Sequence, residues 1–205
     1  MKFPFFASFI VFIVWLTYEL SKTRRIEENQ SKQFWEREKQ ANSTRRKPLD
    51  DLVYITIPLA ELPTEACRDR EDVQECLDVI RTLAQETIVN LTGYTNTDLK
   101  LMYGAPNITA LTQCDQNYTM LARTLQKWAS LLYAQGLADE ARAILEFAVS
   151  TRTDVSGTYR LLASIYRAQG EPEKVAGLMR TVETLPDAAR KIIGRILQES
   201  DPSDG

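Results

Sequence analysis

Apolar residues divide the chain into three regions of different character. The first is an unbroken run from Phe3 to Tyr18 that contains no charged residue. The second, 22–47, is charged, holds only scattered apolar residues and lacks glycine and proline. In the third region apolar residues recur at three- and four-residue steps, which is typical of amphipathic helices. The pattern predicts an all-α protein, with helices over 71–90, within 115–185 and again after Pro186.

The apolar run has the length of a membrane anchor. At about 1.5 Å per helical residue it nearly spans a hydrocarbon core of about 30 Å, with Trp15 and Tyr18 at the interface. A cleaved signal peptide would need a basic start and a cleavage site between small residues, which the run lacks. A buried helix would need a polar face. We therefore predict a single transmembrane helix over 1–21.

Flanking charges predict the topology of this anchor. Lys2 precedes the run, whereas Lys22, Arg24, Arg25 and Lys32 follow it. The positive-inside rule then places the remainder of the chain in the cytoplasm and the N-terminus outside. Residues 22–50 are expected to form a basic helical stalk and linker, in which Pro48 ends the helix. The stalk either is attracted to anionic lipid headgroups or is simply solvated.

Two stretches depart from the helical pattern. In 51–63, Val53, Ile55 and Ile57 alternate with other residues, which predicts an extended segment. No second strand is apparent, so this segment packs along helices, the reading we favour, or completes a sheet in another molecule. Residues 93–107 are rich in turn formers and are expected to form a loop anchored by three apolar side chains, Leu99, Leu101 and Tyr103.

A repeat organises the helical domain, which is expected over 64–199 and is followed by a disordered tail, 200–205. The triplet Ala-Gln-Gly occurs at 134–136 and again at 168–170, and we call the separation between these two triplets the repeat offset. Other positions match at the repeat offset, among them Trp128 with Leu162 and Ala129 with Ala163. Such a period predicts two helical hairpins, about 122–155 and 156–189, with flanking helices that supply the remaining burial.

These residues resemble the tetratricopeptide repeat family over about a third of the chain. The motif is carried by Leu132-Leu-Tyr-Ala-Gln-Gly with Asp139-Glu140-Ala141, and again by Tyr166-Arg-Ala-Gln-Gly with Pro172-Glu173-Lys174. Val175 and Val182 depart from the alanines usual in the family. The segments DDLVYITIPL and NTDLKLMYGAPN are similar to an uncharacterised membrane-anchored family of Gram-positive bacteria, which implies no activity.

The tetratricopeptide resemblance implies a groove that binds a protein or an acidic peptide through the first helix of each hairpin. Four of the eight expected groove side chains are cationic, and hydroxyl groups lie between them, a chemistry suited to carboxylates. An ordinary solvated helix face is the alternative. The expected groove residues are Arg123, Gln126, Lys127, Ser130, Tyr133, Arg160, Ser164 and Arg167.

Composition argues against several other classes of function. The chain has no histidine and no glycine-rich phosphate loop, and its three cysteines lack ligand spacing. We therefore expect no metal, no cofactor and no catalytic site. An odd number of cysteines suits a reducing compartment. The acidic part beyond residue 48 disfavours nucleic acid as a partner. Asn-x-Ser/Thr sequences begin at four asparagines and are expected to be chance matches: Asn42, Asn90, Asn107 and Asn117.

The sequence thus predicts an adaptor at the inner or plasma membrane, with a single transmembrane helix and a cytoplasmic helical-repeat groove. One alternative is a structural subunit of a membrane or envelope complex, assembled through the anchor and the extended segment. A weaker alternative is an enzyme that uses Cys114.

Overall fold

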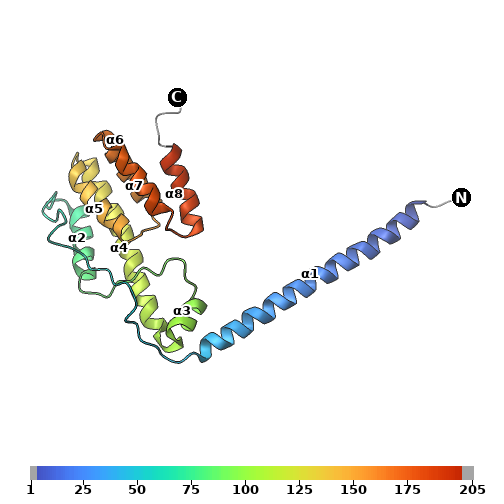
Figure 1. Ribbon diagram of the computed structural model, residues 1–205. Helices are drawn as coiled ribbons and strands as arrows, with labels where there is room; N and C mark the ends of the chain where they lie inside the picture. Colours follow the sequence, from blue (N-terminus) through green and yellow to red (C-terminus); the bar gives the residue numbers. More distant parts are fainter. Residues whose placement is uncertain (1–3, 200–205) are drawn as a thin grey trace. The chain divides into compact units, whose positions relative to one another are not determined.

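The protein is all-α in the part of the chain that the structure describes. The computed structural model describes residues 4–199, and describes no side chain for residues 4–8 and 26. Within residues 4–199 it contains eight α-helices, one 3₁₀ turn and no strand, which confirms the all-α part of the prediction (Figure 1). The predicted tail 200–205 lies outside the described residues. The helices are α1 Pro4–Ser43, α2 Glu71–Leu83, α3 Asn96–Tyr103, α4 Ile108–Ala134, α5 Ala138–Ser150, α6 Ser156–Ala168, α7 Pro172–Val182 and α8 Asp187–Glu199, with the 3₁₀ turn η1 at Ala105–Asn107.

Contacts divide the chain into two compact units, which we describe separately. The first consists of Met1–Pro48 and Thr95–Ile108, and the second of Leu49–Tyr94 and Thr109–Gly205. In the first unit α1 is one continuous helix from Pro4 to Ser43, which includes the described part of the apolar run and most of the stalk. Within the described residues, no helix combines the length and apolarity needed to cross a membrane. The predicted anchor lies partly outside the described residues.

The helix α1 ends at Ser43 and not at Pro48, because the following residues pair with a second segment of the chain. Ala105 N donates to Thr44 O at 3.1 Å, and Lys47 N donates to Tyr103 O at 3.0 Å. The buried Asn107 completes this junction. Its amide nitrogen donates to the carbonyls of Lys47 and Tyr103, both at 2.8 Å, and its oxygen accepts from Arg46 at 2.9 Å.

The prediction of a loop over 93–107 is wrong, because most of this stretch folds into α3 and η1. Thr95 caps α3: Asp98 N donates to the Thr95 hydroxyl at 3.2 Å, and Thr95 N donates to the Asp98 carboxylate at 3.0 Å. This reciprocal capping box satisfies two donors at the start of the helix. Leu99 and Tyr103 are buried, as their predicted anchoring role requires, whereas the third predicted anchor, Leu101, is only half-buried.

In the second unit, 51–63 runs without helix along the core. Ile57 and Leu62 are buried there, and Ile55 N donates to Ile88 O at 2.9 Å. Tyr54 forms an isolated antiparallel bridge with Val89. Val53, which the alternation places on the same face as Ile57, is instead 81% exposed. The predicted alternation therefore does not extend to the start of the segment, where Val53 and Tyr54 are exposed.

The helix α2 also differs from its predicted extent, because it ends at Leu83 rather than near Asn90. Ile88 and Val89 remain buried, but in a turn-rich stretch outside the helix. That stretch is fixed by the side chain of Asn117, whose nitrogen donates to Thr87 O at 3.0 Å.

Helices α4 to α7 form two hairpins of the same design. Gly136 lies in the turn between α4 and α5 with φ of 80°, and Gly170 lies between α6 and α7 with φ of 74°. These left-handed conformations favour glycine. A Cβ at either position would meet nothing within 4 Å, so the backbone conformation alone requires glycine here.

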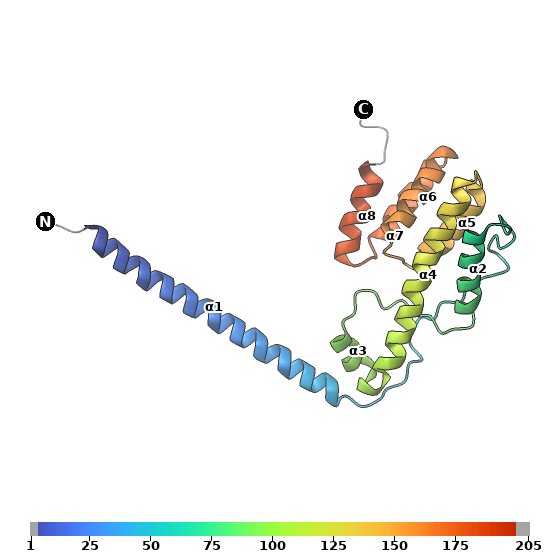
Figure 2. The same cartoon turned by 180° about the vertical axis from the view of Figure 1, so that it is seen from behind.

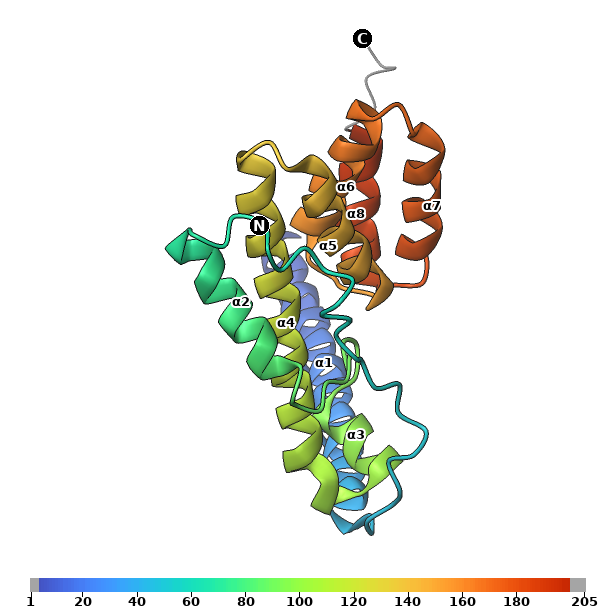
Figure 3. The same cartoon turned by 90° about the vertical axis from the view of Figure 1, so that its left-hand side faces the viewer.

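The terminal helix α8 repeats the first helix of each hairpin. Leu125, Tyr159 and Ile193 are all buried, and each is separated from the next by the repeat offset, in α4, α6 and α8. The same offset relates three further buried residues, Ala129, Ala163 and Leu197. Helix α6 contacts α5, α7 and α8, and α2 adds its apolar side chains to the same core (Figures 2 and 3). The second unit is thus a helical stack with α2 and α8 as its outer members.

Replacing Gly136 by alanine should destabilise the second unit by about 1–2 kcal/mol, because a side chain at positive φ strains the backbone. Gly177, inside α7 and at ordinary φ, provides the control: alanine there should raise stability by about 0.5–1 kcal/mol through helix propensity. Urea unfolding followed by circular dichroism measures both changes. A Gly136→Ala protein as stable as the wild type would contradict the left-handed turn.

Candidate functional site

The structure brings the expected groove residues together on two neighbouring helices. Helix α4 carries Arg123, Gln126, Lys127, Ser130 and Tyr133, and α6 carries Arg160, Ser164 and Arg167. At the repeat offset, Gln126, Ser130 and Tyr133 correspond to Arg160, Ser164 and Arg167. The helices touch at this level, because a Cβ on Gly157 of α6 would lie 3.2 Å from the Gln126 amide nitrogen.

Two of the expected cations are engaged by the fold. Lys127 Nζ lies 3.0 Å from Glu75 Oε2 of α2, and this hydrogen bond raises the pKa of Lys127. Arg167 donates to the carbonyl of Leu197 at 2.9 Å, so it satisfies one of the last carbonyls of α8. Gln126 donates to Ser130 at 3.1 Å along α4. These side chains therefore stabilise the contacts between helices and the end of α8.

Arg123 and Arg160 are the expected cations that remain available. Both are exposed. Among the described residues neither makes an ion pair or a side-chain hydrogen bond. Ser164 and Tyr133 are exposed beside them. We call the surface formed by Arg123, Ser130, Tyr133, Arg160 and Ser164 the basic face.

Charge is sorted between the helices of the second unit. Helix α6 contains no acidic residue, and α4 contains one, Asp115, which accepts from Leu91 N at 3.3 Å. In α8 the acidic residues are confined to its two ends, Asp187 and Glu199. In helices α2 and α5, by contrast, most of the charged residues are acidic: Glu71, Asp72, Glu75, Asp78, Asp139, Glu140 and Glu146. The α4, α6 and α8 side is therefore positive in a protein whose net charge is −3.

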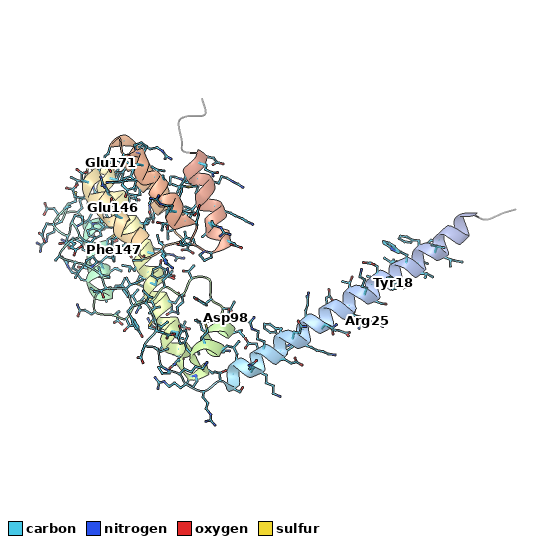
Figure 4. All side chains as sticks on the ribbon, in the orientation of Figure 1. Tyr18, Arg25, Asp98, Glu146, Phe147 and Glu171 are labelled. Carbon is cyan, nitrogen blue, oxygen red and sulfur yellow. The ribbon has the colours of Figure 1, made fainter. Side chains whose placement is uncertain are left out.

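A second polar cluster, not anticipated from the sequence, links α5, α6 and α7. Arg142 pairs with Glu146 at 2.8 Å and with Glu171 at 3.0 Å, and it lies 5.2 Å from the ring centroid of Tyr166. Tyr166 donates to Glu146 at 2.8 Å. Glu171 also pairs with Lys174 at 2.7 Å, and their hydrogen bond lowers the pKa of Glu171. Figure 4 shows Glu146 and Glu171 at neighbouring positions. With its charges matched internally, this cluster joins the two hairpins.

Cys114, the residue of the weaker enzyme alternative, lies on α4 and is half-buried. Burial raises the pKa of its thiol, which disfavours the nucleophilic thiolate. The described residues contain no group of three or more metal-ligating side chains. Asn107 and Asn117 are buried and hydrogen-bonded to carbonyls, so the side-chain amides of these two glycosylation sequences are already bonded inside the fold.

No family model, curated protein or solved structure matches this chain. The structure alone establishes the class of the protein, which is all-helical in the described residues.

We expect Cys114 to alkylate more slowly at pH 8 than free cysteine, because its pKa is raised above the ordinary 9.0. The rate should keep rising above pH 9, where the thiolate forms. Peptide-resolved mass spectrometry after timed iodoacetamide treatment measures the profile, with free cysteine as the reference. Rapid alkylation that is constant between pH 6 and pH 8 would contradict the burial effect and revive the enzyme alternative.

Proposed function

We propose that this protein is a membrane-anchored adaptor whose basic face binds an acidic segment of a partner protein. The observation that carries the proposal is the sorting of charge: Arg123 and Arg160 are exposed and unpaired on adjacent helices, and α6 contains no acidic residue, among the residues that the structure describes. A guanidinium binds carboxylates through paired hydrogen bonds. Ser130, Ser164 and Tyr133 supply neutral donors between the charges.

Resemblance to tetratricopeptide repeats supports this assignment. The two hairpins share the repeat offset, left-handed glycine turns and buried alanines at positions 129 and 163. Stacked hairpins of this kind expose the first helix of each repeat to partner proteins. We infer that α4 and α6 are such helices.

The relation of Lys127 and Arg167 to the partner differs from that of Arg123 and Arg160. Lys127 would have to leave Glu75, and Arg167 would have to leave the end of α8, before either could bind a carboxylate. We therefore assign the principal contacts to Arg123 and Arg160.

Membrane attachment is proposed from the apolar run of α1. Every side chain from Phe9 to Leu16 is exposed, from 38% at Leu16 to 68% at Val11. These residues cover all sides of the helix, so no single partner helix could cover them, whereas lipid surrounds a helix on every side. The exposed Arg25 follows the run, beyond Tyr18 (Figure 4). Positive charge on this side supports a cytoplasmic location for the helical stack.

Replacing Val11 and Val14 together by arginine should release the protein from membranes. Each arginine in the middle of an inserted helix costs about 2.5–3.5 kcal/mol. Carbonate extraction of membranes followed by immunoblotting measures the soluble fraction. Phe34→Arg, which is exposed but lies outside the run, is the matched control and should leave attachment unchanged. Retention of the double variant in the membrane pellet would count against insertion through α1.

Reversing charge at Arg123 and Arg160 by glutamate should reduce partner capture at least about tenfold, because like charges then face the acidic segment. Arg180→Glu makes the same change on α7, where Arg180 is exposed and outside the basic face, and should leave capture unchanged. Affinity purification from detergent-solubilised membranes, with and without competing polyglutamate peptide, measures both. Circular dichroism verifies the fold.

A structural subunit is the second candidate, favoured by exposed apolar side chains at the start of the extended segment. Val53 is 81% and Tyr54 48% exposed. If the Arg123→Glu/Arg160→Glu protein captures the same partner as the wild type, and polyglutamate does not compete, the adaptor proposal fails. The contact then moves to Val53 and Tyr54 or to α1.

A further inference from the structure

The basic face has a third helix. At the repeat offset, Lys191, Gly194 and Gln198 of α8 correspond position for position to Gly157, Arg160 and Ser164 of α6. Lys191 and the nearby Arg195 are exposed, and among the described residues neither forms an ion pair. Between its two ends α8 has no acidic residue. Helix α6 contacts α8, so Lys191 and Arg195 extend the positively charged surface that includes Arg160.

Gly194 leaves a bare stretch of backbone between them. It lies inside α8 at the position equivalent to Arg160, and a Cβ there would meet nothing within 4 Å. Packing therefore does not require glycine at this position. Glycine weakens a helix relative to alanine, and its usual compensation is the close approach of another main chain. The open space above Gly194 is flanked in sequence by Lys191 and Arg195.

We propose that an acidic, extended segment of a partner protein crosses α4, α6 and α8, with its main chain over Gly194. This proposal rests on the adaptor function above and extends it. The partner's carboxylates pair in turn with Arg123, with Arg160, and with Lys191 or Arg195. The charge of the three helices selects this occupant, since α6 offers no acidic group and those of α8 lie only at its ends.

Helix spacing sets the pattern of acidic residues in the partner. Packed helix axes lie about 8–10 Å apart, and an extended chain in the polyproline II conformation advances about 3.1 Å per residue with three residues per turn, so that every third side chain lies on the same side. About three residues of the partner therefore cover the distance from one helix axis to the next. The preferred segment carries an acidic residue at every third position, three in all.

Binding of synthetic peptides to the full chain in detergent micelles tests this inference. The probe is a fluorescein-labelled nonapeptide with glutamate at every third position and serine elsewhere. The control probe has the same composition with its glutamates adjacent. We expect the spaced peptide to bind the wild type at least about threefold more tightly, and Gly194→Leu to weaken its binding at least about tenfold.

Gly177→Leu is the matched variant, because Gly177 also lies inside a helix and its Cβ would meet only the end of Arg180, at 3.9 Å. It should bind as the wild type does. Circular dichroism and thermal unfolding should show both leucine variants folded, since leucine favours helices.

The outcomes separate this inference from the adaptor function. If Gly194→Leu binds normally while Arg160→Glu does not, the partner does not cross α8, and the adaptor proposal stands. Equal affinity for spaced and adjacent glutamates overturns the spacing rule. If the wild type binds neither peptide, both proposals fail. Self-association of the wild type in sedimentation, lost in Arg160→Glu, would instead assign the face to the acidic α2 of a second copy.

Discussion

The second unit depends on one packing constraint: short amphipathic helices cannot bury their apolar stripes alone. Leu125, Tyr159 and Ile193 meet this constraint by occupying equivalent buried positions in α4, α6 and α8. Ala129 and Ala163 lie at a second shared position, where a small side chain lets helix axes approach. Since each helix completes the core of its neighbour, the stack needs α2 at one end and α8 at the other.

This register also decides which polar side chains can bind anything. Once the apolar stripes are buried, the opposite faces of α4, α6 and α8 are exposed together, and nearly all their charges are positive. Lys127 and Arg167 are engaged by Glu75 and by the end of α8. Arg123 and Arg160 are exposed and form no ion pair among the described residues. The basic face is thus a consequence of packing as well as of composition.

The non-helical segments are fixed by a different interaction, hydrogen bonds from asparagine side chains to distant carbonyls. Asn90 donates to Thr151 O at 2.9 Å, Asn117 donates to Thr87 O at 3.0 Å, and Asn107 joins the end of α1 to α3. A buried carbonyl without a partner is costly, so each asparagine stabilises a turn that has no regular ladder of its own. Each of the three begins a glycosylation sequence, yet the structure uses their amides for internal bonds.

The local sequence determined the helical class, the repeat offset and the eight residues expected on one face, because helix periodicity and glycine turns depend on near neighbours in the chain. The turn formers of 93–107 concealed α3, whose capping box of Thr95 and Asp98 is seen in the structure. Other features depended on contacts between distant residues. The end of α2 at Leu83, the exposure of Val53, and the pairing of Lys127 with Glu75 follow from where other segments pack. The equivalence of α8 with α4 and α6 was likewise decided by tertiary structure, since only burial of Ile193 and Leu197 in the common core shows that a helix with little sequence similarity holds the same position.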